Sequence, residues 1–73
     1  MNANPILLQK KYARIVNAFS EKADVTLDDA LAFFYRSMIY TLMKEGISNM
    51  HCMSDLYLVD ALFEEYAKQA QTR

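Results

Sequence analysis

Apolar side chains recur every three or four residues along most of this chain of 73 residues, and a single Gly and a single Pro interrupt the pattern. That spacing places the apolar side chains on one face of a helix. So little Gly and Pro argues against a turn-dense β fold, and a chain of this length forms one domain. We therefore predict an all-α fold: a single helical domain over residues 1–73, built as a small bundle of three to four helices with short loops.

Residue types that begin and end helices mark the limits of the first two helices. Asn4 is a favourable N-cap and Pro5 a favourable first helical residue. The apolar pattern that follows them fades across residues 20–24. Thr26 precedes two acidic residues in a variant of the capping box, and it should begin the second helix. On the buried face of that helix we expect Ala30, Leu31, Phe34 and Tyr35, with Phe33 to one side.

The second half of the chain predicts one or two more helices. Ser37 either bends a continuous helix or ends it and caps the next one, and both alternatives are open. Gly46 suits the left-handed position after a helix, and residues 47–53 form a connector. Ser54 should cap the last helix, which we expect to fray from residue 67 onward. The apolar positions of that helix are Leu56, Val59, Leu62, Phe63 and Tyr66.

Charge and cysteine content exclude several classes of function. The 8 basic and 9 acidic residues give a net charge of -1, which provides no dominant attraction to nucleic acid or anionic lipid. One Cys rules out an internal disulfide framework and fits a reducing compartment. Neither a membrane span nor a signal peptide is recognisable. We therefore expect a cytoplasmic protein without a nucleic-acid or membrane partner, and we interpret one basic group as a solvated helix face: Lys10, Lys11 and Arg14.

Candidates for catalysis reduce to His51 and Cys52, which are adjacent in the sequence. Adjacent side chains on an extended segment point to opposite sides, so they do not readily form a nucleophile–base pair. One His and one Cys also fall short of a zinc ligand set unless a dimer supplies the rest. We expect His51 to be a hydrogen-bonded loop residue and Cys52 a small buried residue. No catalytic residue, cofactor, metal or small-molecule substrate is predicted; a metal- or thiol-dependent enzyme centred on these two residues is the catalytic alternative.

The apolar content, 53%, is high for a chain with so little interior, because a domain of this size buries only about 60% of its unfolded surface. Some aromatic and Met side chains therefore lie at the surface, either as ordinary exposed apolar area or as an interface. Tyr and Met are enriched in interfaces. The candidate partner-binding residues are Tyr35, Tyr40, Met50, Met53 and Tyr57. Tyrosine hydroxyls that bond only to local backbone are the alternative.

One pattern of residues extends across most of the chain, from Ala13 to Ala67. It comprises Phe34-Tyr35-Arg36-Ser37, Tyr40, Gly46-Ile47-Ser48, Met53-Ser54-Asp55 and Tyr57-Leu58. This pattern resembles a family of small bacterial proteins labelled domain of unknown function 3791. The resemblance implies a small helical protein without an established activity, and it provides no catalytic residues to transfer. Because such proteins are often encoded beside other small proteins, some similar to ADP-ribosyltransferases, it also implies a regulatory or antitoxin-like component of a toxin–antitoxin or defence locus.

One function is favoured by three observations together: the high apolar content, the aromatic- and Met-rich second half of the chain, and the absence of a predicted set of catalytic residues. We predict a noncatalytic, cytoplasmic protein-interaction module. It would bind a protein partner, or a second copy of itself as a homo-oligomer, through an aromatic- and Met-rich helical surface.

Overall fold

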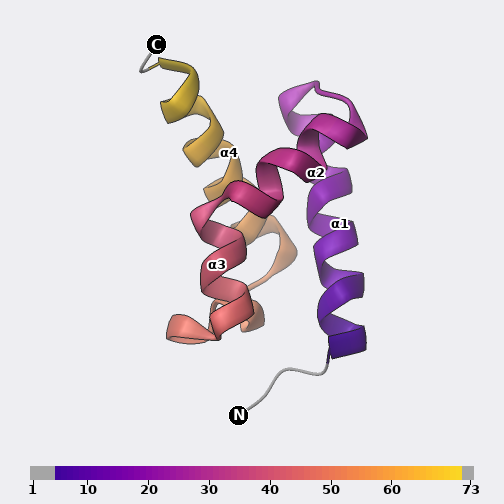
Figure 1. Cartoon of the computed structure of the whole chain (residues 1–73), viewed down its shortest axis with the longest axis vertical. Coiled ribbons are helices and arrows are strands. Elements are labelled where there is room, and N and C mark those ends of the chain that lie inside the picture. Colours follow the sequence, from indigo (N-terminus) through magenta and orange to yellow (C-terminus); the bar gives the residue numbers. More distant parts are fainter. Residues whose placement is uncertain (1–4, 72–73) are drawn as a thin grey trace.

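The computed structural model describes residues 5–71, without the side chains of residues 5, 48, 70 and 71. The described chain contains four α-helices and one 3-10 helix and no strand: α1 (Pro5–Ala23), α2 (Leu27–Arg36), α3 (Met38–Glu45), η1 (Ile47–Cys52) and α4 (Asp55–Gln71). The helix α1 packs against both α2 and α4, and α3 continues from the end of α2 (Figure 1). The predicted all-α bundle with short loops is confirmed. Asn4, the predicted first N-cap, lies outside the described residues.

The junction between α1 and α2 is a tight turn closed by local hydrogen bonds. Residues 20–23, which the sequence places in a helix end and loop, are helical. The helix stops at Asp24, whose φ of 58° is left-handed and available to Asp at modest cost. The hydroxyl of Ser20 donates to the carbonyl of Val25 over 2.8 Å. Thr26 then caps α2 as predicted, because its Oγ1 accepts the N–H of Asp29 over 3.1 Å.

Ser37 separates α2 from α3 and resolves the alternative that the sequence leaves open. Its backbone is extended, with φ -82° and ψ 157°, so it ends one helix and begins the next. Its hydroxyl donates to the carbonyl of Phe34 over 2.6 Å and accepts the N–H of Tyr40 over 3.1 Å. A carboxylate from α4 also reaches this corner, since Glu65 Oε2 accepts the N–H of Met38 over 2.8 Å.

Gly46 ends α3 in the left-handed conformation, with φ 72°, as predicted. The connector after it is the 3-10 helix η1. Ser54 caps α4 as predicted, because its Oγ accepts the N–H of Tyr57 over 3.1 Å. The helix α4 then continues to Gln71, so the predicted fraying from residue 67 is wrong for the described residues.

Among the described residues, one hydrophobic core lies where the four α-helices meet. The burial predicted for α2 is wrong in part. In α2, Phe33 is buried while Leu31 and Tyr35 are exposed, because α2 turns the Ala30–Phe33–Phe34 face toward the core. In α4, Leu56 is 72% exposed although it belongs to the apolar pattern, and Leu58 is fully buried. The fully buried large side chains include Ile15, Phe19, Phe34, Met43, Leu58 and Leu62. None of the described helices is both long and apolar enough to cross a membrane.

Candidate interaction surface

The helix α2 carries a row of large apolar side chains that the core does not cover. Leu27, Leu31 and Tyr35 are 54%, 42% and 51% exposed. Residues four positions apart lie on one helix face, so the three side chains occupy consecutive turns over about 12 Å. Because Ala30, Phe33 and Phe34 fill the core from the neighbouring face, α2 is apolar both toward the core and along this outer row.

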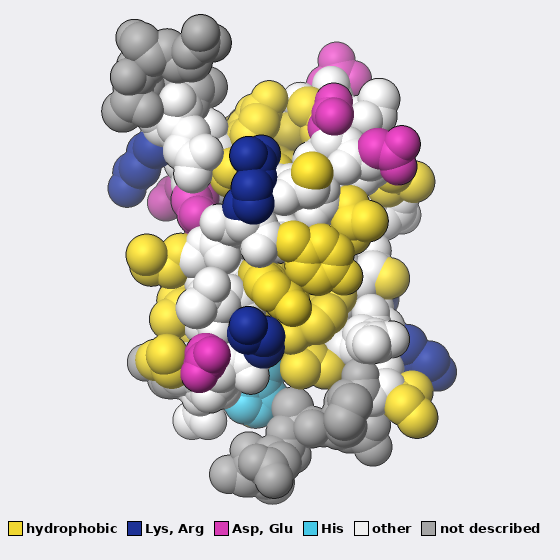
Figure 2. Space-filling model, in the orientation of Figure 1, with side chains coloured by type: hydrophobic (Ala, Val, Ile, Leu, Met, Phe, Trp, Pro, Cys, Tyr) yellow, Lys and Arg dark blue, Asp and Glu magenta, His cyan; other side chains and the backbone are white. Residues whose placement is uncertain are grey.

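This row forms one wall of a surface groove between α1 and α2. Its larger part has a volume of about 540 Å³ and is lined by Ala13, Arg14, Val16, Asn17, Leu27, Asp28 and Leu31. It continues into a hollow of about 220 Å³ lined by Gln9, Tyr12, Ala13, Val16, Leu31 and Tyr35. We call the two together the α1–α2 groove. Ala13, Val16 and Leu31 line both parts, so Leu31 stands at the middle of the groove. Figure 2 shows hydrophobic side chains gathered in the middle of this face of the molecule.

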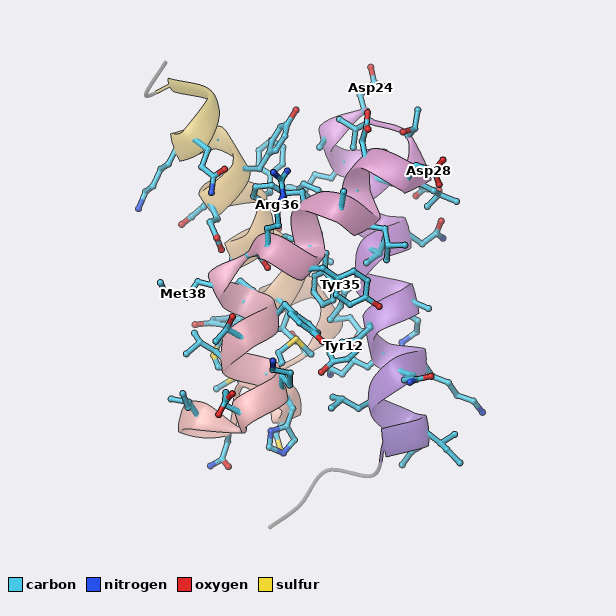
Figure 3. The ribbon with its side chains drawn as sticks, in the orientation of Figure 1. Tyr12, Asp24, Asp28, Tyr35, Arg36 and Met38 are labelled. Carbon is cyan, nitrogen blue, oxygen red and sulfur yellow. The ribbon has the colours of Figure 1, made fainter. Side chains whose placement is uncertain are left out.

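Three tyrosines from three helices pack together at one end of the groove. Tyr35 of α2 and Tyr40 of α3 make an edge contact, with ring centroids 4.9 Å apart, and Tyr12 of α1 lies 5.4 Å from Tyr40. All three rings also pack around Phe34, at 5.3 to 5.7 Å. We call Tyr12, Tyr35 and Tyr40 the tyrosine cluster; Figure 3 labels two of them, close together between α1 and α3. Such edge contacts fix ring orientation and add about 1 kcal/mol each beyond burial.

The phenol of Tyr12, which lines the tyrosine end of the groove, is uncharged at neutral pH. Burial raises the pKa of the Tyr12 phenol, and repulsion from ionised Tyr40 and Tyr35 raises that pKa further. The Tyr12 hydroxyl is therefore a hydrogen-bond donor as well as an acceptor at physiological pH. The ring-lined end of the groove thus offers aromatic area with polar tips, the combination enriched in protein interfaces.

Charged residues differ between the two ends of the groove. At the Leu27 end, Asp28 lines the groove, and Asp24 lies at the same end of α2 (Figure 3). At the tyrosine end, Lys44 Nζ lies 5.5 Å from the centroid of the Tyr40 ring. Arg14 lines the same part of the groove as Asp28, but it is paired with Asp55. Asp28 and Lys44 therefore lie at opposite ends of the apolar row.

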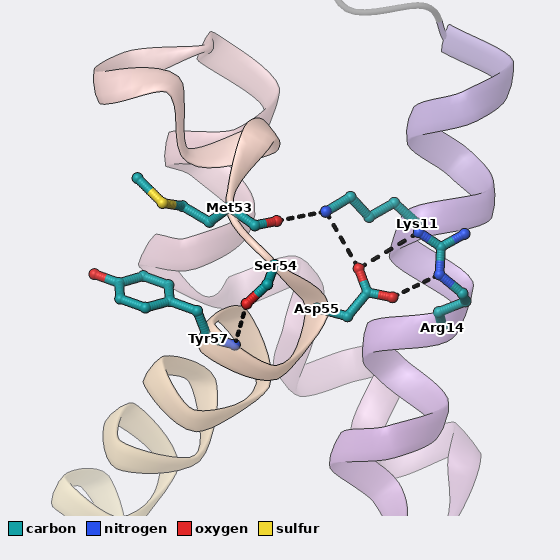
Figure 4. Close-up of polar contacts among 6 residues, drawn as sticks. All are labelled: Lys11, Arg14, Met53, Ser54, Asp55 and Tyr57. Atoms are coloured by element: carbon teal, nitrogen blue, oxygen red, sulfur yellow. Dashed lines mark hydrogen bonds and ion pairs between the residues drawn. The ribbon is translucent and has the colours of Figure 1, made fainter.

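The predicted basic face of α1 is only in part a solvated helix face. Lys11 Nζ donates to the carbonyl of Met53 over 2.5 Å and lies 3.2 Å from Asp55 Oδ1. Arg14 Nε lies 2.6 Å from Asp55 Oδ2 (Figure 4). The hydrogen bond from Arg14 is the main cause that lowers the pKa of Asp55, and Lys11 lowers that pKa further. These two basic residues thus join α1 to the start of α4, while Lys10 is exposed.

The five candidate partner-binding residues separate into groups. Tyr35 and half-buried Tyr40 come together in the tyrosine cluster. Met50 is only 9% exposed and belongs to the core, so the prediction that it lies on a partner surface is wrong. The helix η1, which contains Met50, packs against α3. Met53 is half-buried and Tyr57 is exposed, and their side chains point away from α1 (Figure 4). Among the ring pairs of the described residues, Tyr57 makes none with the tyrosine cluster.

His51 and Cys52 differ from the expectations for them. Cys52 is exposed rather than buried, because η1 lies at the surface. His51 is half-buried, and its Nδ1 is buried without a hydrogen-bond partner among the described residues, contrary to the predicted hydrogen-bonded loop histidine. Within residues 5–71, no group of three or more His, Cys, Asp or Glu side chains is placed to hold a metal ion.

The predicted partner-binding residues did not include Leu27, Leu31 or Tyr12. The signal for the two leucines is present in the sequence, since Leu27, Leu31 and Tyr35 follow each other at intervals of four.

Comparison of the chain with protein-family models, curated proteins and solved structures finds no match. The resemblance to domain of unknown function 3791 therefore stays a prediction.

Proposed function

We propose that this chain is a noncatalytic protein-interaction module and that the α1–α2 groove, with the tyrosine cluster at its end, is its binding surface. The observation that carries the proposal is the exposed row of Leu27, Leu31 and Tyr35 along a groove. Residues that contribute most to protein–protein binding are enriched in Tyr and lie in well-packed pockets surrounded by contacts that exclude water; Tyr35 would be such an anchor, and the two leucines would provide surrounding apolar contacts. A continuous apolar surface of this kind on a small domain typically marks an interaction site.

The shape of the groove favours a helical segment of a protein as its occupant. Anchor side chains of an amphipathic helix recur at i, i+3, i+4 and i+7, which matches the one-turn spacing of the row on α2. The ring contacts within the tyrosine cluster hold Tyr35 in place before binding, so little side-chain entropy is lost on association. We place the module in the cytoplasm, where a reducing environment suits the exposed Cys52 thiol.

Site-specific photo-cross-linking tests this function. A photoreactive phenylalanine analogue replaces either Leu31 in the groove or Leu56 on α4, an exposed leucine of the same size outside the groove. Irradiation in cells of the source organism should give covalent protein adducts from position 31 and only background from position 56. Adducts from position 56 alone, or from neither position, would contradict a binding role for the groove.

A further inference from the structure

We infer that the occupant of the α1–α2 groove is a second copy of this chain, with the two α2 helices antiparallel and Leu31 facing Leu31 across a two-fold axis. This inference rests on the proposed function, because it names the partner of the same surface. Two features of the groove support this inference: the order of its apolar side chains and the distribution of its charges. The small size of the whole chain supports it as well.

The apolar row is compatible with two-fold symmetry. Leu31 lies midway between Leu27 and Tyr35, and it lines both parts of the groove. In a two-fold dimer, the same surface patch is used by both copies. An antiparallel arrangement centred on Leu31 therefore sets Leu27 of each copy against Tyr35 of the other. The apolar side chains of one copy then meet apolar side chains along the whole row.

The charges select the antiparallel arrangement over the parallel one. Asp28 lines the groove at the Leu27 end, where Arg14 is already paired with Asp55. Lys44 lies over the Tyr40 ring at the tyrosine end. Antiparallel copies place Asp28 of each chain toward Lys44 of the other, so both ends are complementary. Parallel copies would place Asp28 beside Asp28, and like charges across an interface are unfavourable. A net charge of -1 per chain adds little general repulsion between copies.

The size of the chain supports self-association as well. A single core in a chain of 73 residues supplies only a few kcal/mol of stability, and association of copies is one of the common ways to add to it. The groove is a small part of a total accessible surface of 5203 Å². The expected dimer is therefore weak and in exchange with the monomer, as is typical of small interfaces.

Charge substitution at the centre of the interface tests the arrangement by sedimentation velocity on the full chain. Leu31→Glu and Leu31→Lys each place two like charges face to face at the two-fold axis. Each variant alone should raise the dimer dissociation constant at least about tenfold over wild type. Mixed in equal amounts, the two variants should form a heterodimer, because Glu then faces Lys. Leu56→Glu, which changes a more exposed leucine outside the groove, should leave dimerisation unchanged. Far-UV circular dichroism checks that each variant is folded.

The possible results separate this inference from the proposed function. A mixture of the two Leu31 variants that stays monomeric, or dimers that survive both substitutions, would overturn the antiparallel pairing. A wild-type chain that is monomeric up to about 1 mM, while position 31 still cross-links to a different protein, would overturn the second copy as occupant and leave the proposed function standing. A monomer without cross-links would overturn both.

Discussion

Asp55 pairs with two basic residues of α1 at the start of α4. Its carboxylate accepts hydrogen bonds from Arg14 and forms an ion pair with Lys11. Asp55 is also the acidic residue in the first turn of α4. A carboxylate there also interacts favourably with the positive end of the helix dipole. Since the side chain of Asp55 is 36% exposed, water screens these interactions. Their total contribution to the stability of the fold is therefore smaller than the short distances alone imply.

Asp55→Asn removes the negative charge and tests this contact. We expect the free energy of unfolding at pH 7 to fall by about 1 kcal/mol. The folded-state pKa of Asp55 lies below its unfolded value, so the stabilisation is complete above about pH 4 and is lost as the pH falls through the folded-state pKa. Urea unfolding at pH 7 and at about pH 2.5 should therefore show a difference from wild type that shrinks with acidification.

Asp60→Asn is the matched control for this pH dependence. Asp60 pairs with Lys22 over 3.5 Å, and both side chains are well exposed, so its loss should change stability by less than about 0.5 kcal/mol. An Asp55→Asn variant that loses as much stability at pH 2.5 as at pH 7 would show that the effect comes from packing rather than from the charge.

At the scale of the elements, the corner between α2 and α3 depends on Ser37. Its side chain is 1% exposed, and its hydroxyl bonds both helices that meet there. Ser37→Ala removes the cap of α3 and leaves the N–H of Tyr40 without its partner. We expect a loss of about 2 kcal/mol in the free energy of unfolding. Because Tyr40 belongs to the tyrosine cluster, the near-ultraviolet circular dichroism of the tyrosines should change too.

Thr26→Ala provides the comparison for Ser37→Ala. It removes an N-cap of the same kind, but Thr26 is exposed, so water can satisfy the freed N–H of Asp29. The expected loss is about 1 kcal/mol, and the tyrosine signal should stay as in wild type. Equal losses from the two substitutions would mean that burial of the Ser37 hydroxyl adds nothing to the corner.

Helix boundaries were largely predictable because they depend on neighbouring residues. Thr26, Gly46 and Ser54 each act within one turn of the helix they begin or end, so local sequence was sufficient. The end of α1 and the length of α4 were not predictable, because a left-handed Asp24 and the packing of α4 against α1 determine them.

The candidate site was predictable only in part, because α2 carries two apolar faces. One contains Phe33 and Phe34, and the other contains Leu31 and Tyr35. Periodicity identifies both faces but not the one that meets the core, since that depends on where α1 and α4 lie. For the same reason the sequence did not predict Tyr12 as the third ring of the tyrosine cluster. It also did not predict the burial of Met50 in the core.

At the scale of the whole molecule, the chain has a filled core and still leaves large apolar side chains uncovered. Besides the row on α2, Met38 and Leu56 are 65% and 72% exposed. Exposed apolar residues scattered singly are normal in proteins. The α2 row differs from them because its members follow one another along a groove. It is therefore the surface whose burial should change the stability of the whole molecule.

Self-association through the α1–α2 groove predicts a melting temperature that depends on protein concentration. If folded chains pair and unfolded chains do not, mass action stabilises the folded state as concentration rises. Between about 10 µM and about 1 mM, the Tm of wild type and of Leu56→Glu should rise by about 4 °C or more, the shift that about 1 kcal/mol produces in a domain of this size. Leu31→Glu should melt at the same temperature throughout, because its folded monomers do not pair. A wild-type Tm that is independent of concentration, measured by calorimetry over this range, would show that the exposed row on α2 is not covered by a second copy.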